Sequence, residues 1–148
     1  MLITVDTLRA DRLGLYGYGR GTTPQLDRWF ADGVVHERAY ATAASTSPSV
    51  VSLLTGLYPS EHRVRLLYQL VPDDVRLVTD WLPASYQTAA VVSNVVLTEA
   101  ALGIARRFDH YDAVVDEKES GRDVDLRRVA VPSAERPVFS EATVADGR

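Results

Sequence analysis

A complete helix, with its start and its stop, is encoded by Ser47-Pro48-Ser49-Val50-Val51-Ser52-Leu53-Leu54-Thr55-Gly56. Proline is favoured in the first turn of a helix, and glycine is favoured just past its end because it adopts the left-handed conformation. The turn before Pro48 is rich in hydroxyl groups, since Ser45 and Thr46 precede Ser47. The sequence therefore predicts a helix that opens at Ser47-Pro48 and stops at Gly56.

Strand-like and helix-like segments alternate on both sides of this helix. Short apolar runs rich in β-branched residues predict buried strands at residues 2–5, 34–41 and 88–93. Capping and periodicity predict helices at residues 23–33, 75–82 and 98–105, and glycines predict a loop at 13–21. This alternation favours an α/β fold, with a mostly parallel sheet covered by helices on both faces.

Composition narrows the classes of function. The chain has 148 residues, 46% of them hydrophobic and 24% charged, which is typical of a globular domain. A net charge of -4 without a basic cluster argues against nucleic acid as a partner, and the absence of cysteine excludes disulfides and thiolate chemistry. No apolar run is long enough to predict a membrane span. No leader precedes Asp6, so the default expectation is a cytoplasmic protein.

Parallel sheets bind their ligands beyond the carboxyl ends of their strands, and the side chains of Thr46 and Asp6 are expected to lie there. Thr46 adjoins the start of a helix, where amide groups and the helix dipole stabilise anions, so its hydroxyl could attack a bound phosphate or sulfate ester. The alternative is that Thr46 only caps the helix. Asp6 ends the first predicted strand and could ligate a hard divalent cation; the alternative is a turn-forming aspartate.

Four ordered motifs together resemble the sulfatase family of the alkaline-phosphatase-like superfamily. They are Leu2-Ile3-Thr4-Val5-Asp6-Thr7-Leu8-Arg9-Ala10-Asp11-Arg12-Leu13-Gly14, Thr23-Pro24-Gln25-Leu26-Asp27, Ser47 to Pro59, and Phe108-Asp109-His110-Tyr111-Asp112. The resemblance assigns residues 1–112 to the amino-terminal part of such a domain, which is incomplete. It implies a divalent cation (calcium, zinc or manganese) held partly by Asp6, and a nucleophile at Thr46.

The chain departs from the family pattern at three positions. Sulfatases use a formylglycine made from cysteine or serine as the nucleophile, and Thr46 cannot be converted to it. Val50 stands where the family has a stabilising arginine, and Thr7 stands where many relatives have a second aspartate. A threonine nucleophile resembles instead the phosphodiesterase and phosphotransferase branches of the superfamily.

The family's remaining metal ligands and its leaving-group acid lie far downstream, and no convincing equivalents are found in this chain. His36 is expected to be a half-exposed strand residue, His62 to order a turn, and His110 to pack or lie on the surface. Lys118 lies in a polar segment, residues 113–134, that predicts a linker or a disordered stretch. Residues 135–148 resemble a late strand of the family.

The resulting expectation is a metal-dependent hydrolase of sulfate or phosphate esters, truncated and without half of its metal site. The substrate would be a small-molecule, glycan or lipid ester. The alternatives are a non-catalytic remnant of such an enzyme and a phosphodiesterase or phosphotransferase with a threonine nucleophile. An incomplete sheet would also leave an exposed edge, through which copies of the chain could associate.

Overall fold

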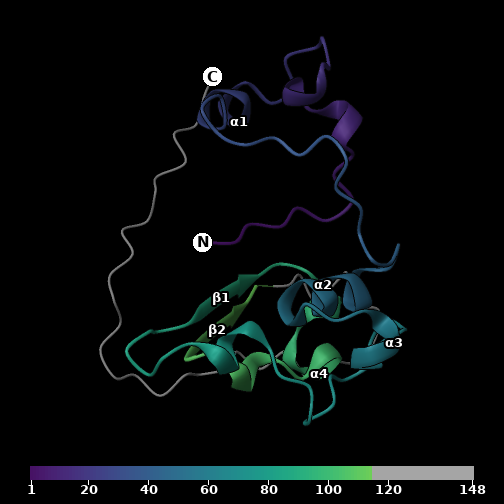
Figure 1. Ribbon diagram of the computed structural model, residues 1–148, viewed down its shortest axis with the longest axis vertical. Coiled ribbons are helices and arrows are strands. Elements are labelled where there is room, and N and C mark those ends of the chain that lie inside the picture. Colours follow the sequence, from purple (N-terminus) through teal and green to yellow (C-terminus); the bar gives the residue numbers. More distant parts are fainter. Residues whose placement is uncertain (115–148) are drawn as a thin grey trace. The chain divides into compact units, whose positions relative to one another are not determined.

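The computed structural model describes residues 1–114, and the chain divides into two compact units, Met1–Leu67 and Tyr68–Arg148. The first unit contains helices α1 (Pro24–Trp29), α2 (Thr46–Thr55) and α3 (Pro59–His62), together with 3-10 turns at Ala10–Arg12 and Gly14–Tyr16. The second contains strands β1 (Ala89–Val92) and β2 (His110–Ala113) and helix α4 (Glu99–Leu102), as Figure 1 shows. The fold is therefore α/β.

Helix α1 is held to the preceding loop by Asp27. Its carboxylate accepts hydrogen bonds from the Leu15 amide and the Thr23 hydroxyl, both at 3.1 Å. The same hydroxyl accepts one from the Gly14 amide at 3.0 Å. The Asp27 carboxylate lies so close to Gly14 that a Cβ there would come within 2.1 Å of an oxygen. The loop therefore depends on glycine at position 14.

Helices α2 and α3 are joined by a short turn and pack against each other. Gly56 ends α2 in the left-handed conformation, with φ of 72°, and its amide donates to the Ser52 carbonyl at 2.8 Å. Pro59 opens α3, and the Glu61 carboxylate accepts a 2.8 Å hydrogen bond from the Tyr58 amide. The predicted start and stop signals of α2 are thus matched by its observed bounds, within one residue at either end.

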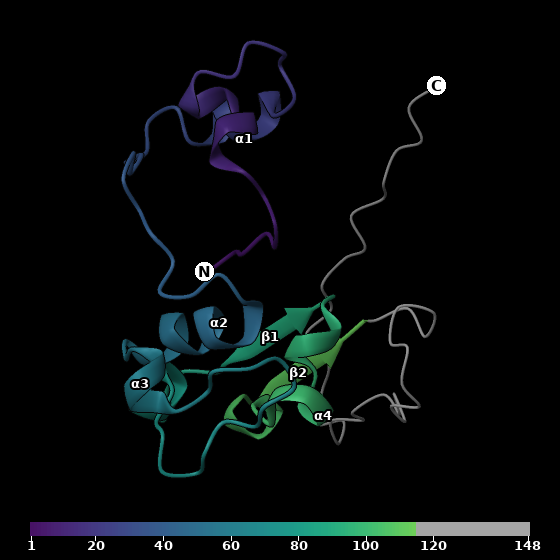
Figure 2. The ribbon, with the colours of Figure 1, turned by 90° about the vertical axis from the view of Figure 1, so that its right-hand side faces the viewer.

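The sheet of the second unit pairs β1 with β2 in parallel, with Ala89 opposite His110 and Val92 opposite Ala113. Figure 2 shows the two arrows side by side. Asp109 fixes the start of this pairing: its carboxylate accepts from the Thr88 amide at 2.7 Å and from the Thr88 hydroxyl at 2.8 Å. These bonds hold the pKa of Asp109 below its ordinary value.

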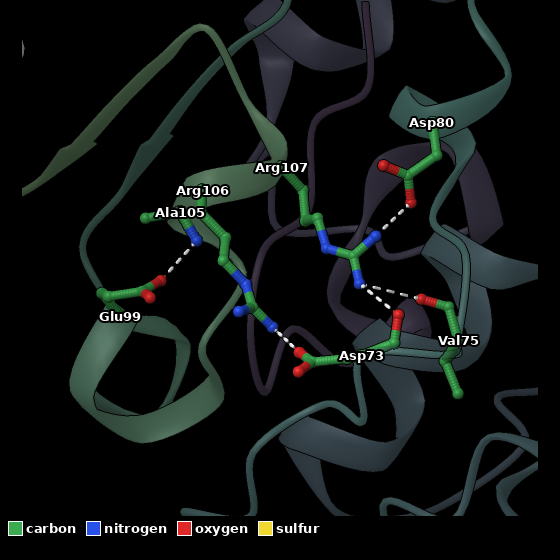
Figure 3. Close-up of polar contacts among 7 residues, drawn as sticks. All are labelled: Asp73, Val75, Asp80, Glu99, Ala105, Arg106 and Arg107. Carbon is green, nitrogen blue, oxygen red and sulfur yellow. Dashed lines mark hydrogen bonds and ion pairs between the residues drawn. The ribbon is translucent and has the colours of Figure 1, made fainter.

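Two neighbouring arginines bind the segment after β1 to the loop that begins the second unit (Figure 3). Arg107 donates to the Asp80 carboxylate at 2.7 Å and to the carbonyls of Asp73 and Val75 at 3.0 and 3.3 Å. Arg106 pairs with the Asp73 carboxylate. These contacts fix residues 73–80 against the turn that enters β2.

Several predicted elements are absent from residues 1–114 or take another form. Residues 2–5 and 34–41 are not strands: Leu2 is 61% exposed and Val34 is 85% exposed. A strand needs a neighbour to satisfy its backbone groups, and apolar pattern alone cannot supply one. The predicted helix at 75–82 is only a 3-10 turn, Val78–Trp81, where the Asp80 side chain accepts from the Leu77 amide. The predicted helix at 98–105 is shortened to α4 because Gly103 ends it.

Other predictions stand as follows. The strand predicted at 88–93 is confirmed as β1, and the parallel pairing is confirmed for β1 and β2. The predicted linker 113–134, apart from Ala113 and Val114, and the predicted strand 135–148 lie outside the described residues. Among residues 1–114, every helix is too short or too polar to cross a bilayer.

Candidate functional site

Thr46 is the first residue of α2, rather than the residue before it as the sequence predicted. Ser45 precedes the helix in an extended conformation, and its side chain makes no capping hydrogen bond. The Thr46 hydroxyl donates instead to an Asp6 carboxylate oxygen at 3.1 Å. The two candidate site residues, 40 positions apart in sequence, are therefore in direct contact within the first unit.

The contact joins a half-buried hydroxyl to an exposed carboxylate. A carboxylate that accepts a hydrogen bond from a hydroxyl orients it and favours loss of its proton during attack on an ester. Helix α2 carries no ionisable side chain along Thr46–Thr55, so Asp6 supplies the charge at this contact. The arrangement can thus position a nucleophile next to a proton acceptor.

Asp6 sits in a turn, and the next residue adopts an unusual backbone conformation. Thr7 has φ of 57°, in the left-handed region that a β-branched residue rarely occupies. This conformation costs about 1–2 kcal/mol relative to an ordinary one. The turn that holds the Asp6 carboxylate next to Thr46 is therefore strained at Thr7.

The amino end of α2 offers few amide groups to an anion. Pro48 has no N–H, and the Ser49 amide donates to the Ser45 carbonyl at 3.2 Å. Pro48 thus removes one of the roughly four amide groups that the first turn of an ordinary helix presents. The helix dipole favours an anion here, but the side chains must supply more of the binding than the sequence interpretation assumed.

The donor chemistry of Asp6 and Thr46 suits a hard divalent cation, because both present oxygen atoms. Calcium binds about six to eight oxygen ligands, and smaller divalent cations bind about four to six ligands. Residues 1–114 contain no group of three or more histidine, cysteine, aspartate or glutamate side chains that could hold a metal ion. Asp6 and Thr46 could therefore form only part of a cation site.

The other candidates take different positions. His36 is exposed and is not in a strand, and His110 is an exposed residue of β2. Just past the end of β1, the side-chain oxygen of Asn94 accepts a hydrogen bond from the Val96 amide at 3.0 Å and caps the turn that follows the strand. Lys118 lies outside the described residues.

His62 is fully buried and lies 2.9 Å from the Ser52 hydroxyl, a contact that the sequence interpretation missed. The two residues are ten positions apart, on α2 and α3. A helix stop at Gly56 and a helix start at Pro59 predict a tight reversal between them, and this was the available signal.

The chain is similar to a known protein family and, over shorter stretches, to individual proteins of that family. The sulfatase family matches residues 1–111. A stretch of 57 residues is 44% identical to an N-acetylgalactosamine-6-O-sulfatase of Bacteroides thetaiotaomicron, and covers 38% of this chain and 11% of that protein. An arylsulfatase of Clostridium perfringens is 39% identical over 62 residues, which cover 42% of this chain and 13% of that protein.

An N-acetylgalactosamine-6-sulfatase of Sus scrofa is 39% identical over 59 residues, covering 40% of this chain and 11% of that protein. The matched stretches thus span only 11–13% of the length of these three relatives. No solved structure matches the chain significantly. Since the family match extends over residues 1–111 of 148, the chain belongs to the sulfatase family.

Proposed function

We propose that Asp6 and Thr46 form the nucleophile side of a metal-dependent hydrolase of sulfate or phosphate esters, with an alkaline-phosphatase-like fold in the whole protein. The observation that carries the proposal is the 3.1 Å hydrogen bond from the Thr46 hydroxyl to the Asp6 carboxylate. Membership in the sulfatase family supports ester hydrolysis as the reaction. A divalent cation, when bound, would neutralise the charge of the ester and lower the pKa of the hydroxyl.

The chain's own residues account for the first half of the reaction. The Thr46 oxygen attacks the phosphorus or sulfur atom, its proton passes to the Asp6 carboxylate, and the bond from that atom to the alcohol oxygen breaks. The alcohol leaves with a proton from solvent. Water then attacks the same phosphorus or sulfur atom and gives a proton to solvent, the bond to the Thr46 oxygen breaks, that oxygen takes back its proton from Asp6, and phosphate or sulfate is released.

The identity of the nucleophile favours phosphate over sulfate. The named relatives are sulfatases. Threonine cannot become formylglycine, and a threonine hydroxyl suits phosphoryl transfer to the enzyme. The substrate is then a phosphate ester of a small molecule, glycan or lipid, and transfer to an alcohol instead of water is the phosphotransferase form of the same chemistry.

A second candidate is a non-catalytic remnant of such an enzyme. One observation favours it: residues 1–114 contain no group of three or more histidine, cysteine, aspartate or glutamate side chains that could hold a metal ion. In that case the Asp6–Thr46 contact is a structural hydrogen bond between the amino-terminal turn and α2.

Hydrolysis of aryl phosphate and aryl sulfate esters, with manganese, zinc or calcium added, separates the two candidates. The enzyme is expected to show metal-dependent release of the aryl alcohol, which Thr46→Ala abolishes and Thr46→Ser largely keeps. Asp6→Asn should lower the rate at least tenfold, while the matched exposed variant Asp32→Asn leaves it unchanged. Absence of turnover in the unaltered chain would establish the remnant, and turnover unaffected by Thr46→Ala would refute Thr46 as the nucleophile.

A further inference from the structure

The buried contact between α2 and α3 determines where the proton of His62 lies. The His62 side chain is fully buried and Ser52 is 6% exposed. Nε2 of His62 lies 2.9 Å from the Ser52 hydroxyl, and Nδ1 lies 3.1 Å from the backbone amide of Val64. A backbone N–H can only donate, so Nδ1 must be the acceptor and carries no proton.

The Val64 amide therefore determines which ring nitrogen of His62 carries the hydrogen. A neutral imidazole has one protonated nitrogen, so Nε2 carries the hydrogen and donates it to the Ser52 oxygen. A serine and a histidine 2.9 Å apart have the spacing of a catalytic pair. Here, however, the histidine nitrogen that faces the serine is already protonated and cannot accept the hydroxyl proton. The pair therefore holds structure together and does not activate a nucleophile.

We infer that Ser52, His62 and the Val64 amide form an acid-sensitive latch that joins α3 to α2. Protonation would place a second hydrogen on Nδ1, facing the N–H of Val64, so the 3.1 Å hydrogen bond would be lost. The charged ring would also be fully buried. Opening the latch exposes the ring to water, which removes the cost of the lost hydrogen bond and the cost of burying the charge. Acid therefore favours the open form.

The charges around the ring do not offset this effect. Helix α2, which packs on α3, has no ionisable side chain, and the charged neighbours in sequence are Glu61, Arg63 and Arg65. Burial lowers the pKa of His62. The carbonyl groups of His62 and Pro48 and the charge of Glu61 favour the protonated ring, but burial outweighs them.

The direction of the pH effect follows from this lowered pKa. An unfolded or open chain binds the proton near the ordinary pKa of 6.5, whereas the closed latch binds it only at lower pH. Stability from the latch is therefore complete above about pH 6.5 and falls as the pH drops toward the pKa of the closed form. One proton changes the unfolding equilibrium constant by up to about tenfold per pH unit.

Two measurements on the full chain test the latch. Long-range proton–nitrogen NMR correlations near neutral pH should place the ring hydrogen of His62 on Nε2. On acidification, His62 in the folded protein should stay neutral to a pH below its ordinary pKa of 6.5. A hydrogen on Nδ1, or a titration of His62 at or above pH 6.5, would overturn the inference without the need for a variant.

Urea unfolding at several pH values between about 6.5 and 5, above the range where carboxylates titrate, provides the second test. The unfolding constant should rise on acidification in the unaltered chain and stay flat in His62→Gln. His36→Gln and His110→Gln are the matched controls and should keep the rise. Ser52→Ala should weaken stability most near neutral pH, where the latch is closed. An undiminished acid response in His62→Gln would refute the latch.

Discussion

Arg107 donates a 2.7 Å hydrogen bond to the Asp80 carboxylate, although only 17% of the Arg107 side chain and 25% of the Asp80 side chain are exposed. The adjacent Arg106 also forms an ion pair, but its side chain is 53% exposed and that of its partner Asp73 is 83% exposed. Two consecutive arginines therefore make the same kind of interaction in different surroundings, and this difference can be measured.

Arg107→Ala is expected to lower the free energy of unfolding by about 2–3 kcal/mol, because it leaves a half-buried carboxylate and two backbone carbonyls without their donor. Arg106→Ala should cost less than about 0.5 kcal/mol, since exposed ion pairs contribute little. Urea denaturation of the two variants gives both values. Equal losses would show that burial does not distinguish the two pairs.

Gly14→Ala should destabilise the first unit by about 1–3 kcal/mol, because the added Cβ displaces the Asp27 carboxylate from its bonds to Leu15 and Thr23. Gly19→Ala is the matched control, since a Cβ at that position meets nothing within 4 Å. Thermal unfolding followed by circular dichroism compares the two. A Gly14→Ala protein as stable as Gly19→Ala would mean that Asp27 can move without loss.

Tyr111→Phe should cost about 1 kcal/mol, because the Tyr111 hydroxyl donates to the Leu97 carbonyl from a side chain only 2% exposed. Tyr86→Phe, at a position 60% exposed, should be neutral. Urea denaturation measures both, and equal stability of the two variants would count against a role for the buried hydroxyl.

Alkaline pH should destabilise the same region. Burial, with the nearby charge of Glu99, raises the pKa of Tyr111 to about 12 from an ordinary 10.0. The unfolded chain releases this proton first, so stability is complete below about pH 10 and falls as the pH rises toward about 12. Ultraviolet titration should show a tyrosine that ionises near pH 12. Tyr111→Phe should abolish that late step.

Thr7→Asn should raise stability by up to about 1 kcal/mol, because asparagine tolerates the left-handed conformation that threonine adopts there at a cost. Thr7→Val keeps the β-branched shape without the hydroxyl, so it should give no gain. Chemical denaturation of the three proteins gives the comparison. If both variants lose stability equally, the threonine hydroxyl matters more than the backbone strain.

Local signals in the sequence were sufficient for the elements that carry their own boundaries. Pro48 lies in the first turn of α2 and Gly56 follows its last residue, and the apolar run at 89–92 forms β1. The same reasoning failed at residues 2–5, because a strand depends on a partner that no local pattern specifies. It also overestimated the helix at 75–82, where the Asp80 side chain bonds to the Leu77 amide and closes a tighter turn.

The candidate site was predictable as two residues but not as a complete set of ligands. Ordered motifs pointed to Asp6 and Thr46, and the structure brings these two side chains together. The register of α2 was misplaced by one residue, so Thr46 lies inside the helix and Pro48 removes an amide from its first turn. The Ser52–His62 contact was missed because each residue has an ordinary role when considered alone.

The parallel pairing of β1 and β2 has a consequence for how the protein is made. Both strands and the whole of their connection, residues 93–109, have left the ribosome once Val114 is free of the exit tunnel. Closing a connection of this length costs only a modest amount of chain entropy. This strand pair can therefore form during translation, while the residues that follow it are still inside the exit tunnel.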